Sequence, residues 1–485
     1  MKTWMRIICL AIAAIMLRNW ILWNKASFQP ETSDHFRNYV ESAKSPKISI
    51  DSDGSHPQQP IKLSQQLETT EFFSSCLLVF DEGHRLPEWL AYHYYMLPLR
   101  HLVIMSDPSA ITDPSSILER WKPYMEITVW SDERINFQPS DEEGHPKAAV
   151  QIHRERQRFF YKACAAYLRS INRTWVTFHD VDEYVTIDAE VVPNAHERIQ
   201  RPGSVLQLIQ EHAVSKGPPP TPQIKSLAQL HETSCLIVPR AYFGATESPE
   251  LVQKLVPSFL IGRHFETLRF VYRIDHSNAH NGRGKSLVHV SRPESLDFKD
   301  KGVHSLISTC KTRDVKQAAI RIRHYLGTWE VYTSRLDPRR GGFRNRQHYL
   351  YRSELGRDRP PDDFVRPWLK GFCDQFYNNE TVIRKLLEGT GQVVVSPDIQ
   401  KLSANVSAWS LPPTRIKELI DSKAATNKPG SFPHWLKEHY KVQNQSGVLV
   451  VDTRTGRFDK SYRTDLSKTR AFMLVLVWFL NSWDF

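Results

Sequence analysis

Between residues 72 and 131, short apolar runs alternate with amphipathic stretches. Buried-strand runs at 76–80, 101–105 and 126–130 are separated by helical patterns at 87–97, which opens with Pro87, and at 115–122. This β-α-β-α-β order predicts a parallel sheet with right-handed crossovers, the nucleotide-binding half of a doubly wound fold. A long basic helix is predicted over 148–170.

The pattern changes on both sides of this region. Residues 24–71 are rich in Ser, Pro, Gln, Asp and Lys and predict a flexible stem. A proline-rich loop is predicted at 217–222, with strands at 235–238 and 268–274 after it. We therefore predict a cytoplasmic tip and anchor at 1–23, the stem at 24–71, an α/β domain at 72–350 and a mainly helical extension at 351–485, whose apolar segment 471–480 is too short to span a bilayer.

The N-terminus predicts entry into the secretory pathway. Lys2 and Arg6 precede an apolar run at 7–17, and Trp20 and Trp23 follow it. A signal anchor is favoured over a cleaved signal peptide, because no small-residue cleavage site follows. Basic residues before the span place the bulk of the chain in the lumen, and four glycosylation acceptors agree: Asn172, Asn379, Asn405 and Asn444.

Net charge and cysteine content indicate which binding partners and which cellular compartment suit the protein. The net charge of +11 favours anionic partners or serves solubility. No basic run is interleaved with aromatic residues, so a nucleic-acid groove is not expected. Cys9 lies in the apolar segment; the other five cysteines form one or two disulfides in an oxidising lumen or stay as buried thiols.

The most informative segment, residues 174–188, is an apolar and aromatic run interrupted by Asp180-Val181-Asp182-Glu183. In an extended strand Asp180 and Asp182 project from the same side. Two carboxylates about 4 Å apart repel by about 4 kcal/mol at an effective dielectric near 20, which predicts a divalent cation between them. The alternative is a solvated turn or a helix cap.

Further candidates surround this motif. Asp81 and Asp107 follow two predicted strands and bind a base or ribose, or else cap the next turn. His304 is the preferred third metal ligand, ahead of His324. Lys285 lies in Gly-Arg-Gly-Lys-Ser, which fails as a phosphate-binding loop because the first glycine is replaced by Ala279, yet it remains a candidate phosphate contact.

The order of several blocks resembles glycosyltransferase family 92. The blocks span about residues 72–335: Glu88-Trp89-Leu90-Ala91-Tyr92-His93, Asp180 to Tyr184, Arg240-Ala-Tyr-Phe243-Gly244, Lys285-Ser286-Leu287-Val288, His304, and His324-Tyr325. The chain departs from the family at Glu247-Ser248, where Gly-His is usual, and at Ser106-Asp107-Pro108. These departures leave the acceptor and the donor open.

The resemblance implies a GT-A fold, with a mixed, mainly parallel sheet flanked by helices, in a type II Golgi membrane enzyme. It further implies a nucleotide-sugar donor of the UDP-sugar kind, transfer of a hexosyl group, galactose by analogy, to a glycan or glycoprotein, and manganese, with magnesium as the alternative. Asp180 and Asp182 would then bind the donor diphosphate through the metal.

Inverting transfer also needs a carboxylate that deprotonates the acceptor hydroxyl. Glu247 is the first candidate for this base and Glu266 the second. Two other function classes remain open at this stage. A metal-dependent phosphodiesterase or hydrolase would use the same aspartates, and a non-catalytic carbohydrate-binding protein would keep the fold without turnover.

Overall fold

The structure is a computed structural model, and it describes residues 72–138, 146–214, 235–247, 252–275, 318–334 and 345–395, with short segments between 278 and 312 and beyond 418. The predicted anchor, the stem, the loop at 217–222 and the apolar segment 471–480 lie outside these residues. Within them, no helix is both long enough and apolar enough to cross a membrane.

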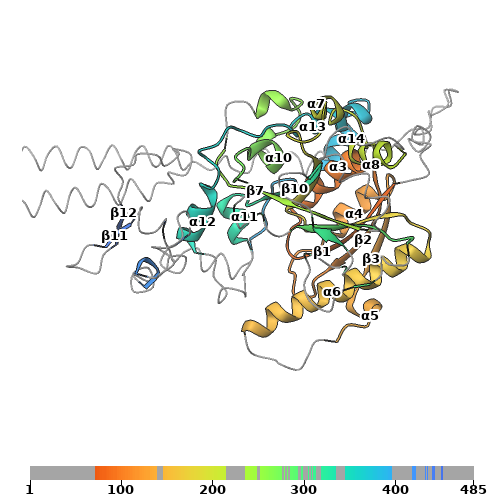
Figure 1. Cartoon of the computed structure of the whole chain (residues 1–485), viewed down its shortest axis with the longest axis horizontal. Coiled ribbons are helices and arrows are strands. Elements are labelled where there is room, and N and C mark those ends of the chain that lie inside the picture. Colours follow the sequence, from red (N-terminus) through yellow and green to blue (C-terminus); the bar gives the residue numbers. More distant parts are fainter. Residues whose placement is uncertain are drawn as a thin grey trace, which may run out of the picture. The chain divides into compact units, whose positions relative to one another are not determined.

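A seven-stranded sheet in the order β3-β2-β1-β4-β8-β6-β9 forms the centre of the fold (Figure 1). The first four strands in this order pair in parallel, β8 pairs antiparallel to both β4 and β6, and β9 is parallel to β6. The strands span Phe73–Val79 (β1), Leu99–Ser106 (β2), Glu126–Trp130 (β3), Trp175–Phe178 (β4), Cys235–Val238 (β6), Lys285–His289 (β8) and Lys311–Thr312 (β9). The predicted α/β class with a mixed, mainly parallel sheet is confirmed.

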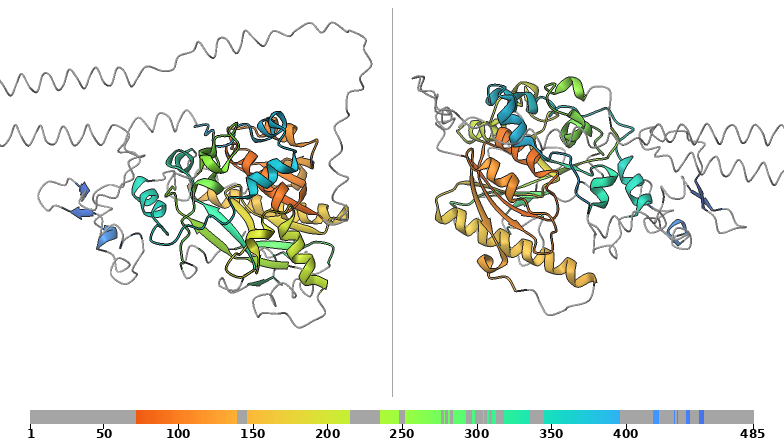
Figure 2. Two further views of the ribbon diagram at one scale, coloured as in Figure 1. Left: turned by 90° about the horizontal axis from the view of Figure 1, so that it is seen from above. Right: turned by 180° about the vertical axis from the view of Figure 1, so that it is seen from behind.

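Helices cover both faces of this sheet. Helix α6 (Pro146–Ser170) lies along one face, and α3 (Leu86–Met96), α13 (Trp368–Gln375) and α14 (Glu380–Leu387) lie on the other (Figure 2). Side chains alternate across each strand, so Cys76 and Leu78 of β1 pack in the α6 core while Leu77 and Val79 pack in the α3 core. Part of the predicted extension beyond residue 350 thus packs against α3.

A second, three-stranded sheet in the order β5-β10-β7 lies beside the first. It consists of β5 (Glu183–Ile187), β10 (Ile320–Tyr325) and β7 (Arg240–Phe243), with β10 antiparallel to β5 and parallel to β7. The antiparallel register places His324 opposite Glu183. This sheet therefore brings a histidine to the end of the Asp-x-Asp motif.

The remaining elements are short. The helices among them are α4 (Ser115–Trp121), α5 (Asp132–Ile135), α7 (Ala195–Arg198), α8 (Ser204–Val214), α10 (Glu266–Arg269), α11 (Trp329–Thr333), α12 (Arg346–Ser353), and the 3-10 turns η2 (Gln253–Leu255) and η3 (Gly262–His264). Two strands, β11 (Tyr440–Val442) and β12 (Leu449–Val451), form a separate hairpin.

Two predicted strands are wrong in part. The run at 174–188 is divided into β4 and β5 by a turn at Asp180–Glu183, whose ends are joined by the Glu183 N–H donating to the Asp180 carbonyl at 3.0 Å. The strand predicted at 268–274 is instead the end of α10 followed by isolated bridges at Phe270 and Arg273. There the carboxylate of Glu88 accepts the first N–H groups of the helix, which favours a helical turn over an extended strand.

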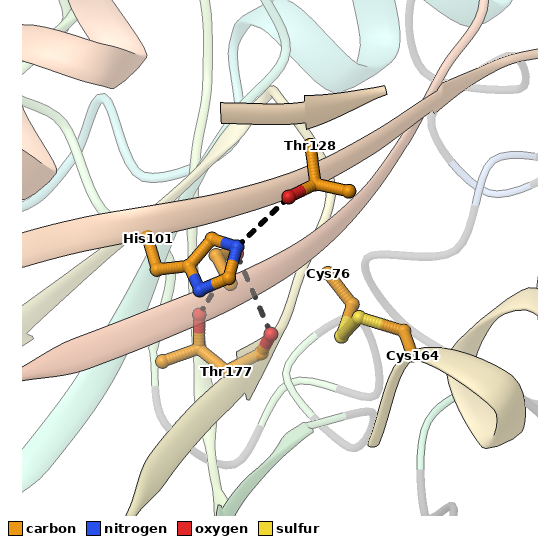
Figure 3. The surroundings of a disulfide bond; sticks show 6 residues. Cys76, His101, Thr128, Cys164 and Thr177 are labelled. Carbon is orange, nitrogen blue, oxygen red and sulfur yellow. Dashed lines mark hydrogen bonds between the residues drawn. A yellow bond between two sulfur atoms is a disulfide. The ribbon is translucent and has the colours of Figure 1, made fainter. Parts of the chain in front are cut away.

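Two disulfides lie among the described residues. Cys76 of β1 is bonded to Cys164 of α6, and Cys235 of β6 is bonded to Cys310, while Cys373 is a buried free thiol. Figure 3 shows the first bond beside His101, which hydrogen-bonds to Thr128 at 3.0 Å. Of the two alternatives left open by the sequence, disulfides are confirmed for four of the five cysteines.

Candidate functional site

The Asp-x-Asp motif forms the turn at the carboxyl end of β4, beside the ends of the parallel strands β1 and β2. The prediction that both carboxylates project from one side of a strand is wrong, because the backbone turns at Asp180–Glu183 and buries Val181. The two aspartates instead contact different groups.

Asp180 is paired with a buried lysine. The Lys285 ammonium lies 2.7 Å from Asp180 Oδ2 and 3.3 Å from Glu183 Oε2, and its side chain is only 1% exposed. The Gln157 amide of α6 donates to Asp180 Oδ1 at 3.0 Å. The chain itself therefore supplies the positive charge that the sequence led us to expect from an ion beside Asp180.

Burial and charge act in opposite directions on this trio. Burial opposes ionisation of Asp180, but Lys285 reverses this effect and holds the pKa of Asp180 well below its usual range. The pKa of Lys285 is raised, because Asp180 and Glu183 outweigh its desolvation. Burial and the two neighbouring aspartates raise the pKa of Glu183 to about 8 even though Lys285 opposes the shift.

Asp182 contacts a second group of residues. Its Oδ2 lies 3.7 Å from Arg85 Nη1 and 3.5 Å from His324 Nε2, while its buried Oδ1 has no hydrogen-bond partner among the residues that the structure describes. Within the same residues, the buried Nδ1 of His324 also has none. Asp182, Glu183 and His324 each offer a ligand atom, and these atoms lie within 4.8 Å of one another.

This donor set fits a divalent cation. Two carboxylates and an imidazole match the ligands of manganese and other first-row metals, and buried unpaired acceptors are expensive unless something satisfies them. Asp182 is therefore the aspartate that can hold a metal. His304 also lies close enough to Asp180 for its charge to lower the pKa of that group, so both candidate histidines are brought to the site.

Two buried histidines, His93 and His179, lie next to the Asp-x-Asp turn. His93 Nε2 accepts the Val185 N–H at 3.1 Å, and its Nδ1 lies 2.8 Å from the Trp89 carbonyl, so Nδ1 carries the proton. His179 then donates through Nε2 to His93 Nε2 at 3.1 Å. Burial lowers the pKa of both imidazoles, that of His93 to about 3, which keeps the pair neutral.

Asp81 and Asp107 both bind neighbouring loop groups. Asp81 Oδ1 accepts the N–H groups of Ile111 and Thr112 at 2.7 and 2.8 Å. Asp107 accepts from Ser109, and its Oδ2 lies 2.7 Å from His153 and 3.0 Å from Arg156, both on α6. Asp107 thus caps the turn that follows it, which was the alternative to donor binding, whereas Asp81 binds a loop 30 residues further along the chain.

The two candidate bases have different surroundings. Glu247 forms an ion pair with Arg269. Glu266 is buried and accepts two hydrogen bonds from Arg85, at 2.9 and 2.8 Å, and Arg85 in turn reaches Asp182. Glu266, and not Glu247, is therefore connected through one side chain to the Asp-x-Asp turn.

A cavity of about 410 Å³ opens beside Arg85 and Glu266. Its wall also includes Glu88 of α3, Thr328 and Glu330 near the start of α11, and the segment 391–395 after α14. Neither Arg85 nor Glu88 was predicted as a site residue. Glu88 stands in the recognised Glu-Trp-Leu-x-Tyr-His block, but its role depends on α10, which is distant in the sequence.

Known proteins show only a distant structural likeness to this chain. No protein-family model matches the chain, and no curated protein matches it. Among solved structures, the crystal structure of S. aureus TarS 1–349 is similar with a TM-score of 0.25 and 11% identity, over 79% of this chain and 96% of that one. A likeness at this level supports no argument about function, so the resemblance to glycosyltransferase family 92 stays a prediction.

Proposed function

We propose that this protein is a glycosyltransferase that moves a hexosyl group from a nucleotide sugar to a glycan acceptor with the help of a divalent metal. The observation that supports this most is Asp182. It follows a parallel strand at the carboxyl edge of the sheet, where ligands of such folds bind, and its buried Oδ1, beside Glu183 and His324, lacks a hydrogen-bond partner in the described part of the chain. The order of the motif blocks favours glycosyl transfer, with galactose as the sugar by analogy and a UDP-sugar as the donor.

The metal would be held by Asp182, Glu183 and His324. Manganese suits this set better than magnesium, because magnesium prefers oxygen ligands alone. When bound, such an ion neutralises the charge that develops on the diphosphate as the sugar departs. Asp180 orients the turn, since Lys285 and Gln157 hold its two oxygens.

Placement in a secretory compartment such as the Golgi is part of the same proposal. Two disulfides within the described residues are typical of proteins that fold in an oxidising lumen. The predicted N-terminal anchor and the glycosylation acceptors agree with this location.

The first test measures donor turnover and metal binding together. Asp182→Asn removes a charged ligand but keeps the size of the side chain, so we expect manganese affinity, followed by titration with electron paramagnetic resonance, to fall at least 10-fold. Transfer from UDP-galactose and other UDP-sugars should fall at least 100-fold, and EDTA should abolish it in the wild type. Glu119→Gln on the exposed face of α4 is the matched control and should change neither value.

Three outcomes would contradict the proposal. Activity that resists both EDTA and Asp182→Asn would exclude the metal role. Hydrolysis of phosphodiesters without any sugar acceptor would favour the phosphodiesterase alternative. Nucleotide or glycan binding without turnover across the whole donor panel would favour a non-catalytic carbohydrate-binding protein.

A further inference from the structure

The two aspartates of the Asp-x-Asp turn contact different parts of the fold: Asp180 contacts α6, and Asp182 contacts Arg85. On one side, Asp180 contacts Gln157 of α6, and the same helix contacts Asp107 through His153 and Arg156. This side follows the carboxyl ends of β1, β2 and β4, where a nucleotide binds in parallel α/β sheets. It is therefore the side expected for the donor.

On the other side, Asp182 leads to the cavity. Arg85 lies 3.7 Å from Asp182 and donates two hydrogen bonds to Glu266, and both Arg85 and Glu266 line the cavity. Arg85 thus contacts both Asp182 and this cavity, whose wall is formed by residues outside α6. Inverting glycosyl transfer needs a separate place for the acceptor, because in that reaction the acceptor must approach the sugar on the side opposite the leaving diphosphate.

The charges on the cavity wall point to a neutral ligand. The wall carries both basic and acidic side chains: Arg85, Arg263, Arg269, His84 and His264, and Glu88, Glu266 and Glu330. Arg85 is paired with Glu266, and Arg269 is paired with Glu247 just outside the wall. An anionic ligand would meet the carboxylates, whereas hydroxyl groups can donate to carboxylates and accept from guanidinium groups.

The size and the apolar part of the wall agree with a sugar. A cavity of about 410 Å³ falls within the range of about 300–1,000 Å³ that small ligands occupy. Val331, Val393 and Val395 supply apolar surface, which suits the C–H face of a pyranose ring. The chain after α14 thus forms part of this wall.

Contacts with Glu88 and Gly327 fix the position of Glu266 in the cavity wall. Its backbone N–H donates to Glu88 Oε2 at 2.8 Å, and Gly327 packs against its carboxylate, where an added Cβ would lie 2.6 Å from Oε1. Gly327 also has a φ of +79°, so glycine is needed there both for the left-handed backbone and for the lack of space for a side chain. Burial raises the pKa of Glu266, as a base needs, despite the opposing charge of Arg85.

We propose that this cavity is the acceptor subsite, that it binds one neutral, hydroxyl-rich sugar residue of the acceptor glycan, and that Glu266 is the catalytic base; this inference rests on the proposed glycosyltransferase function. Glu266 takes the proton of the acceptor hydroxyl while that oxygen bonds to the anomeric carbon. The bond from this carbon to the diphosphate oxygen breaks, and its electron pair leaves with the nucleoside diphosphate. A single displacement of this kind inverts the anomeric configuration.

A pair of neighbouring valines gives a sharp test. Val393 lines the cavity, whereas Val394 is not part of its wall and is 60% exposed. Val393→Trp should fill the subsite and raise the KM for neutral methyl glycosides of galactose, glucose, mannose and N-acetylglucosamine at least 10-fold, with Val394→Trp as the matched control at the wild-type value. Binding of UDP with manganese, measured by calorimetry, should stay within threefold in both variants.

Glu266→Gln tests the base without filling the cavity. It should lower kcat by about 10²- to 10⁴-fold, the usual contribution of a general base, and leave UDP–manganese binding within threefold. Equal acceptor kinetics in the two valine variants, a preference for glucuronate over the neutral glycosides, or a product with retained configuration would overturn the proposal. Failure of the wild type to bind UDP–manganese would instead count against the proposed function itself.

Discussion

At the residue scale, helix α3 supports both sides of the site with two polar side chains. His93 holds the backbone of Val185 and the ring of His179, next to the Asp-x-Asp turn. Glu88 accepts the N–H groups of Glu266 and Thr267 and the Thr267 hydroxyl, at 2.8, 2.9 and 2.7 Å. The Glu-Trp-Leu-x-Tyr-His block therefore contributes positioning residues, although the block by itself reads only as a buried helix.

Glu88 makes the stability of the fold depend on pH. Burial and the nearby Glu266 raise the pKa of Glu88 to about 7 from 4.5, against the effect of its hydrogen bonds. Between these values the native protein holds a proton that the unfolded chain releases, so the contribution of Glu88 to stability falls as the pH rises from about 4.5 to about 7. The full difference is on the order of 3 kcal/mol.

We expect Glu88→Gln to remove this dependence. The variant cannot titrate, so its free energy of unfolding in urea should decline less steeply than that of the wild type between pH 5 and pH 7. Exposed Glu119→Gln should follow the wild-type curve. Parallel curves for wild type and Glu88→Gln would show that Glu88 is ionised in the native state across this range.

At the element scale, most strands and helices follow from the local pattern. The predicted strand at 126–130 matches β3, and the predicted helix at 148–170 begins two residues inside α6. The error at 174–188 has a physical cause. Most residues of β4 and β5 favour a strand, but the Asp180–Glu183 hydrogen bond and the Lys285 ion pair stabilise a turn between them, and Lys285 comes from a distant strand.

The Cys76–Cys164 disulfide connects β1 of the central sheet to α6, the helix that bears Gln157 and Arg156. Cys76 and Cys164 are separated by 88 residues, so closing this loop restricts the unfolded chain considerably. We expect the double variant Cys76→Ala/Cys164→Ala to lose about 2–5 kcal/mol of unfolding free energy in denaturant titrations. Cys373→Ala, which removes a buried free thiol, should lose about 1 kcal/mol. A double variant no less stable than Cys373→Ala would argue that this bond does not form.

At the scale of the whole molecule, the cysteine pattern bears on the compartment where the chain folds. If the protein passes through an oxidising lumen, the protein isolated from such cells should contain Cys76–Cys164 and Cys235–Cys310 as linked peptides. Denaturation and alkylation without reductant should label Cys373, and labelling of the four paired cysteines should require reductant. Their labelling without reductant would contradict the proposed secretory location.

The local sequence determined most of the elements before residue 190, the parallel sheet class and the importance of the Asp-x-Asp motif, because strand and helix periodicity are short-range properties. Only the tertiary structure decided which group each aspartate contacts. Lys285, His324 and Arg85 reach the turn from positions about 100 to 140 residues away, Glu266 is connected to it through Arg85, and no local pattern encodes such pairings. The site therefore has one side at α6 and a cavity at Glu266 only in the folded protein, because burial and charge pairing between residues distant in the sequence create this arrangement.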